Sequence, residues 1–285
     1  MAQQDGYWVV RTYKAGLLGE KTKFWVPGKR PDKKLSRRQR DAIKKQSQNE
    51  YSAVKRFARD MHHNYTGNDS FLTLDYSKAG YSRLEKWATG KGVDLETLTD
   101  EECREVIWAA AEHELNLCLR RAQNKAKKVG VELKAMMTTS DQKYDRKLQQ
   151  YMQVRIHHHI VINREAVPFF QEAWEKLGNY KDKYLSTYGE DWTELADYIV
   201  SQVRRIPDAK KYRSTRTVIH PEPKDRIVNS DAELQVPRGG KLLFRREFTR
   251  SGQPQYIRYV LPKAYENRKL PSDCEKFNEK DGKRL

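Results

Sequence analysis

The clearest pattern in the chain is the alternation of apolar and polar residues in YMQVRIHHHIVIN, residues 151–163. A period of two predicts a β-strand whose side chains point in turn to opposite faces of a sheet. One face carries Val154, Ile156, His158, Ile160 and Ile162. The other carries Gln153, Arg155, His157, His159, Val161 and Asn163. The strand therefore predicts a sheet with an apolar core side and a mostly polar side.

Weaker patterns predict the remaining elements. The predicted strands are residues 7–13 and 21–26, which form a hairpin, and then 71–76, 131–139, 241–248 and 256–260. The predicted helices cover about residues 36–62, 99–128, 165–177 and 191–205, with Thr99 as a cap of the long helix. This order predicts the α+β class, with a central antiparallel sheet and helices packed on one of its faces.

The elements group into three parts along the chain. Residues 1–65 contain the N-terminal hairpin, the basic arm 28–45 and a lead-in helix. Residues 66–220 form the predicted core domain, and residues 221–285 form a small C-terminal β extension with a polar tail.

Charge narrows the class of partner. The chain has 56 basic and 39 acidic residues, a net charge of +17, which favours binding to nucleic acid. No apolar run approaches the roughly 18 residues of a membrane span, and we expect no membrane partner. The three cysteines form no C-x-x-C pair, which favours a reducing cytoplasm.

The polar side of the histidine strand predicts a metal site. His157 and His159 project together from one face, and two neutral imidazoles at this spacing can share one ion. Asp141, just after the preceding strand, is the first candidate for a third ligand and Gln153 is the second. His158 faces the core and is predicted to be a hydrogen-bonded structural residue. The alternatives are chance histidines on a surface strand and an ordinary turn aspartate.

Three segments in order resemble one family. FLTLDY (71–76), RIHHHIVIN (155–163) and ADYIVSQVRR (196–205) are similar to the three motifs of the HUH endonucleases. Within this superfamily, the chain more closely resembles the replication-associated proteins of bacterial phages and plasmids, the group related to the filamentous-phage gene II protein. KYRSTR (211–216) resembles a basic segment that often follows the third motif, and the likeness covers roughly residues 7–217.

The resemblance implies a fold and a reaction. It implies an RRM-like sheet on which His157 and His159 bind a divalent cation, Mg²⁺ or Mn²⁺. It also implies nicking of single-stranded DNA at a replication origin through a 5′-phosphotyrosine, which starts rolling-circle replication. The chain has no G-x-x-x-x-G-K-[ST] motif, so we expect neither a nucleotide cofactor nor a fused helicase. A host helicase and a host polymerase are therefore the implied partners.

The implied nucleophile is Tyr198. On the predicted helix 191–205 it lies at the edge of an apolar stripe made of Trp192, Leu195, Ile199 and Val203. The pattern alone favours a packing tyrosine, and the resemblance favours the nucleophile. Further candidates are Tyr212, Tyr184 and Tyr188.

The chain departs from the family pattern at three places. Asp75 replaces the second threonine of a common T-L-T-Y ending. Both Ser140 and Asp141 align with the acid that precedes the histidine strand. Many relatives carry a second tyrosine or a lysine near Gln202, and its absence indicates a single-tyrosine enzyme.

Basic residues near these motifs are candidate DNA contacts. They are Arg155, Arg204, Arg205, Lys211, Arg213 and Arg216, with Tyr212 as a candidate for base stacking. Arg205 and Lys211 are also candidates for the cation that relatives place near the tyrosine. Competing hypotheses are a relaxase or single-tyrosine transposase of the same superfamily, and a non-catalytic DNA-binding protein.

Overall fold

The computed structural model describes residues 6–28, 53–145, 148, 150–203, 211–229, 232–246 and 255–261. The chain divides into two compact units. Unit 1 combines Met1–Ser52 with His220–Leu285, and unit 2 is Ala53–Ile219. Each unit has one five-stranded antiparallel sheet, and the five α-helices of the described ranges belong to unit 2. The predicted α+β class is confirmed.

The sheet of unit 1 joins the two ends of the chain. Its strand order is β8-β1-β2-β10-β9. The strands are β1 Gly6–Ala15, β2 Leu18–Pro27, β8 Lys224–Val228, β9 Lys241–Arg246 and β10 Gln255–Val260. The β1–β2 hairpin turns at Gly16, whose φ of 57° suits a glycine. The predicted hairpin and the predicted C-terminal strands thus share one sheet, although the sequence placed them in separate parts.

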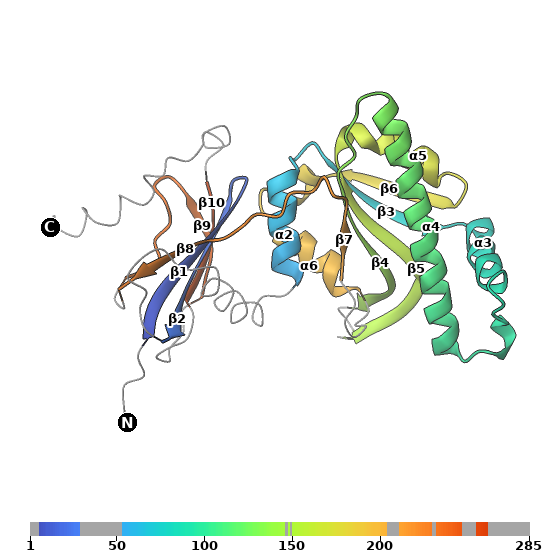
Figure 1. The fold of residues 1–285 in the computed structure, drawn as a ribbon, viewed down its shortest axis with the longest axis horizontal. Helices are drawn as coiled ribbons and strands as arrows, with labels where there is room; N and C mark the ends of the chain where they lie inside the picture. The colour runs from blue at the N-terminus through green and yellow to red at the C-terminus, as the bar shows by residue number, and fades with distance from the viewer. Residues whose placement is uncertain are drawn as a thin grey trace. The chain divides into compact units, whose positions relative to one another are not determined.

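The sheet of unit 2 has the order β6-β3-β5-β4-β7, with all pairs antiparallel. Its strands are β3 Ser70–Tyr76, β4 Ala135–Asp145, β5 Gln150–Ile162, β6 Gly178–Tyr184 and β7 Arg213–Ser214. The histidine strand β5 is central, between β3 and β4 (Figure 1). Its side chains are therefore flanked by neighbours on both sides.

The helices of unit 2 are α2 Ala53–Asn64, α3 Lys78–Thr89, α4 Asp100–Lys128, α5 Val167–Trp174 and α6 Thr193–Ser201. Short 3₁₀ turns cover Leu95–Thr97, Arg164–Ala166 and Leu185–Tyr188. The predicted cap of the long helix is confirmed as a capping box. Thr99 accepts a hydrogen bond from the backbone N–H of Glu102, whose carboxylate accepts one from Thr99 N–H.

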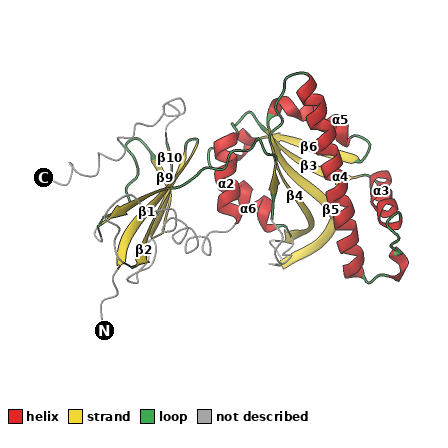
Figure 2. Cartoon of the chain, in the orientation of Figure 1, coloured by secondary structure: helices red, strands yellow, loops and turns green. Residues whose placement is uncertain are grey.

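Helices cover both faces of this sheet, where the sequence predicted one (Figure 2). Leu72 and Ile160 pack with α3, α4 and α5, and Trp174 is among the largest buried side chains there. Phe71 and Val161 pack on the opposite face with α2 and α6. The reason lies in the strands themselves, because both faces are apolar at this end and each needs a cover.

Candidate functional site

The polar half of the sheet of unit 2 begins where the apolar residues under α6 end. Strand register aligns Phe71, Val161 and Met136 in an apolar row. The next row on the same face is Thr73, His159 and Thr138, and the third is Asp75, His157 and Ser140. We call the face that carries these three rows the histidine face.

His157 and His159 lie side by side on this face. Their ring centroids are 4.9 Å apart and the rings are nearly perpendicular, at 79°. Both side chains are buried, and His159 is only 1% exposed. Burial, together with a smaller effect of the nearby His157, lowers the pKa of His159 to about 3. His159 is therefore a neutral imidazole, the form that binds metal ions.

The hydrogen bonds of the two rings involve Nδ1 in each case. Nδ1 of His157 lies 3.0 Å from the carbonyl oxygen of Arg155. Because a carbonyl only accepts, Nδ1 carries the proton and Nε2 presents a lone pair. Nδ1 of His159 lies 3.4 Å from the Thr73 hydroxyl, while its buried Nε2 has no hydrogen-bond partner among the described residues. A buried nitrogen without a partner fits a cation at this position.

His158 points to the other side of the sheet. Its Nε2 lies 2.9 Å from the Tyr76 hydroxyl and its Nδ1 lies 2.9 Å from the Thr139 hydroxyl. Complete burial holds its pKa well below the usual value. His158 is the hydrogen-bonded core residue that the alternation predicted.

Tyr198 stands over the histidine face on α6. Its ring centroid lies 5.4 Å from that of His159, and the residue is 46% exposed. Leu195 and Ile199 anchor the helix in the core between α6 and the sheet. The tyrosine therefore combines a fixed backbone with a side chain that solvent, or a ligand, can reach.

A short hydrogen-bonded link fastens the end of α6 to β4. The Ser140 hydroxyl donates to the backbone carbonyl of Gln202 at 2.6 Å. The Gln202 side chain in turn donates to the carbonyl of Tyr198 at 2.8 Å. Gln202 is buried, and it follows the last residue of the helix. Sequence reasoning missed this link, although Gln202 follows Tyr198 by one helical turn.

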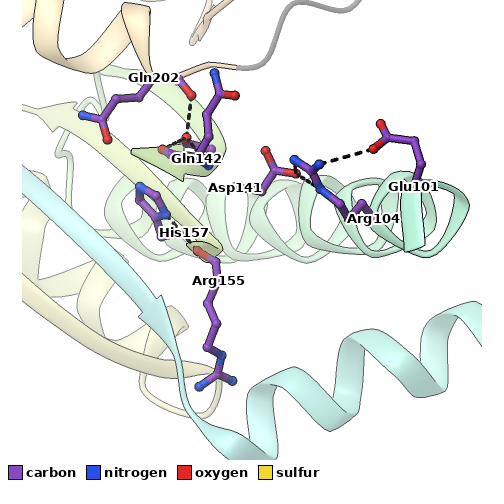
Figure 3. Close-up of polar contacts among 8 residues, drawn as sticks. Glu101, Arg104, Asp141, Gln142, Arg155, His157 and Gln202 are labelled. Atoms are coloured by element: carbon purple, nitrogen blue, oxygen red, sulfur yellow. Dashed lines mark hydrogen bonds and ion pairs between the residues drawn. The ribbon is translucent and has the colours of Figure 1, made fainter. Parts of the chain in front are cut away.

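The structure does not bring Asp141 to the histidines. Its Oδ2 accepts two hydrogen bonds from Arg104 of α4, at 3.0 Å from Nε and 2.8 Å from Nη2. Glu101 accepts a third bond from the same guanidinium (Figure 3). A register shift in β4 lies between Ser140 and Gln142, and Ser140 is the residue opposite His157.

The second candidate ligand is also distant. Gln153 is exposed and lies four residues before His157, about 13 Å along an extended strand. Within the ranges that the structure describes, no three His, Cys, Asp or Glu side chains form a group that holds a metal ion. The two imidazoles are the part of the predicted metal site that the fold assembles.

Several predicted DNA contacts are engaged elsewhere. Tyr212 donates to Asp60 at 2.8 Å, and Arg213 binds Asn116 and Glu112 of α4. The Arg155 guanidinium lies 4.9 Å from the ring centre of Tyr81. These contacts favour structural roles for Tyr212 and Arg213.

The other predicted contacts differ in their surroundings. Lys211 donates a long hydrogen bond of 3.4 Å to the carbonyl of Val203, and Arg216 is exposed. Arg204 and Arg205 lie outside the described residues.

The histidine face also carries two lysines, Lys181 and Lys183, which the sequence pattern did not indicate. The edge strand β6 pairs Lys181 with Thr73 and Lys183 with Phe71, so both lysines belong to this face, and both are exposed. The signal was hidden because GNYKDKY is polar at nearly every position and shows no alternation. Once β6 is placed, they become candidate phosphate contacts.

Among the helices of the described ranges, none has the length and apolar content that crossing a membrane requires.

Comparisons with protein-family models, with curated proteins and with solved structures gave no match.

Proposed function

We propose that this chain is a metal-dependent endonuclease of the HUH type that nicks and rejoins single-stranded DNA to initiate rolling-circle replication. The observation that carries the proposal is the position of the exposed Tyr198 ring, 5.4 Å from the His159 ring and on the face shared with His157. The central antiparallel sheet fits the RRM-like core that the motifs imply.

The residues present fit a divalent cation. Nε2 of His157 presents a lone pair because its Nδ1 is held by a carbonyl, and Nε2 of His159 is buried without a partner in the described chain. When bound, Mn²⁺ or Mg²⁺ would supply a Lewis acid that holds and polarises the scissile phosphate. Imidazole ligands favour Mn²⁺ over Mg²⁺.

The chain's own residues would perform the transfer. The Tyr198 oxygen attacks phosphorus and the phenol loses its proton. The bond from phosphorus to the 3′ oxygen breaks, and that oxygen leaves with a proton. The 5′ phosphate stays on Tyr198 as a diester, so a later 3′ hydroxyl can reverse the reaction and reseal the strand.

The remainder of the face would hold the substrate. Lys181 and Lys183 place two exposed cations on the histidine face, and the net charge of +17 favours a polyanion. A replication origin as the substrate, a host helicase and polymerase as partners and the cytoplasm as the place of action complete the proposal.

The test uses single-stranded oligonucleotides that tile the DNA encoding the chain and its flanks. Each carries a 3′ label, because the fragment on the tyrosine retains the 3′ part of the strand. With Mn²⁺ we expect a covalent adduct on a denaturing gel, which Tyr198→Phe and the double variant His157→Ala with His159→Ala both abolish.

Tyr188→Phe is the matched control, because Tyr188 lies near Tyr198 and packs on Phe71. It should retain the adduct. An adduct that persists in Tyr198→Phe would show that the nucleophile is wrong. DNA binding without any adduct would favour a non-catalytic DNA-binding protein.

A further inference from the structure

Asp75 occupies a position on the histidine face that the reaction above leaves unused. It is the cross-strand partner of His157 in the β3–β5 pair, and its side chain is exposed. Directly opposite residues of an antiparallel pair have Cβ atoms roughly 4.5–5.5 Å apart. The carboxylate is therefore within one side-chain rotation of the His157 ring.

The two imidazoles leave an unmet requirement. They are neutral ligands, whereas Mn²⁺ and Mg²⁺ prefer oxygen donors and gain from a negative charge. The three rows on β3, β4 and β5 contain nine described residues, and Asp75 is the one among these nine that carries a carboxylate.

The neighbouring strand cannot supply this charge in the same way. Asp141 is held by two hydrogen bonds from Arg104 of α4. On the histidine face, β4 presents Ser140, whose hydroxyl already donates to the carbonyl of Gln202. A charged ligand beside His157 would therefore have to come from β3, where Asp75 is the residue opposite His157.

We propose that Asp75 supplies the charged oxygen ligand of the cation held by His157 and His159. The inference rests on the proposed function, because it requires a cation at this pair. Since no group of three ligands is formed within the described ranges, the Asp75 side chain turns towards His157 when the cation binds. The Asp75 side chain is exposed, so this rotation takes place at the protein surface.

The experiment measures Mn²⁺ binding without DNA, by calorimetry and by the electron paramagnetic resonance signal of free Mn²⁺. We expect Asp75→Asn to weaken Mn²⁺ binding about ten-fold or more, the scale on which ligand-shell changes act. Asp75→Glu keeps the carboxylate and should recover most of the affinity. Asp141→Asn is the matched control on β4 and should stay within about two-fold of the native chain.

Three outcomes separate the hypotheses. If Asp75→Asn binds Mn²⁺ as tightly as the native chain while the double variant His157→Ala with His159→Ala does not, the role of Asp75 is refuted and the histidine site stands. The same holds if Asp141→Asn loses as much affinity as Asp75→Asn. If the double histidine variant also binds normally, the proposed function fails with it. Matching thermal unfolding curves for Asp75→Asn and the native chain exclude a folding defect.

Discussion

Ser140 of β4 donates a hydrogen bond of 2.6 Å to the backbone carbonyl of Gln202, the residue that follows the last turn of α6. The bond ties the helix that carries Tyr198 to the strand beside the histidines. Because the last carbonyls of a helix lack partners within it, the serine also satisfies a buried acceptor.

Removing this hydroxyl should loosen the helix. We expect Ser140→Ala to lower the free energy of unfolding by about 1–2 kcal/mol, since a buried carbonyl loses its donor. Adduct formation should slow, while DNA affinity stays near the native value. Urea unfolding and single-turnover kinetics measure the two effects, and the exposed Ser186→Ala serves as the control. An unchanged unfolding curve would contradict the role of this bond.

The ion pair between Arg104 and Asp141 should contribute to stability. The Asp141 side chain is 7% exposed and that of Arg104 is 23% exposed. Arg104→Met takes the guanidinium from a mostly buried carboxylate, and we expect the free energy of unfolding to fall by roughly 2–3 kcal/mol. Chemical denaturation measures the change. Arg216→Met, at an exposed position, should change stability by less than about 0.5 kcal/mol, and an equal loss in both variants would contradict the prediction.

The consecutive histidines should respond differently to substitution. His158→Ala removes the ring that lies within hydrogen-bond distance of the buried hydroxyls of Tyr76 and Thr139 and opens a cavity. We expect a loss of about 3 kcal/mol in the free energy of unfolding. His157 lies on the histidine face, and we expect His157→Ala to lower the free energy of unfolding by less than His158→Ala does. The His157→Ala variant should instead lose Mn²⁺ binding. Equal destabilisation by the two variants would show that the faces are not distinct.

Cys118 should be chemically inert in the native protein. Burial raises the pKa of its thiol to about 11, so the reactive thiolate is about one part in a thousand at pH 8. We expect iodoacetamide to modify Cys118 after unfolding in urea and not before, as read by peptide mass spectrometry. Cys103, which is partly exposed, reports on the reagent.

The same shift makes stability depend on pH. The folded chain keeps the Cys118 proton up to about pH 11, while the unfolded chain releases it above the ordinary thiol pKa near 8.5. Its contribution to stability is therefore complete below about pH 8.5 and declines as the pH rises towards 11. Cys118→Ala should flatten this alkaline decline, and an identical slope would argue against it.

The periodicity of apolar and polar residues along the chain was enough to predict several parts of the fold. The alternation in residues 151–163 correctly separates His158 from His157 and His159, and Thr99 marks the start of the long helix. Both are decided by neighbours along the chain, which a sequence displays directly.

The features that escaped prediction depend on distant partners. The edge strand β6 is polar throughout, and its pairing with β3 fixes it in the sheet. Asp141 is directed by a register shift and by Arg104, 37 residues away in the sequence. The second helical layer follows from Phe71 and Val161, whose face is evident only once the strands are paired.

Strands β1 and β2 pair with β8 and β10, so unit 1 is built from two separate segments of the chain. Unit 2 is a single continuous segment that lies between them in the sequence. During synthesis, the ribosome therefore releases all of Ala53–Ile219 before the first hairpin meets its remaining strands. His157, His159 and Tyr198 all belong to unit 2, so a chain that ends shortly after Ile219 would contain these three residues but lack β8, β9 and β10 of the unit 1 sheet.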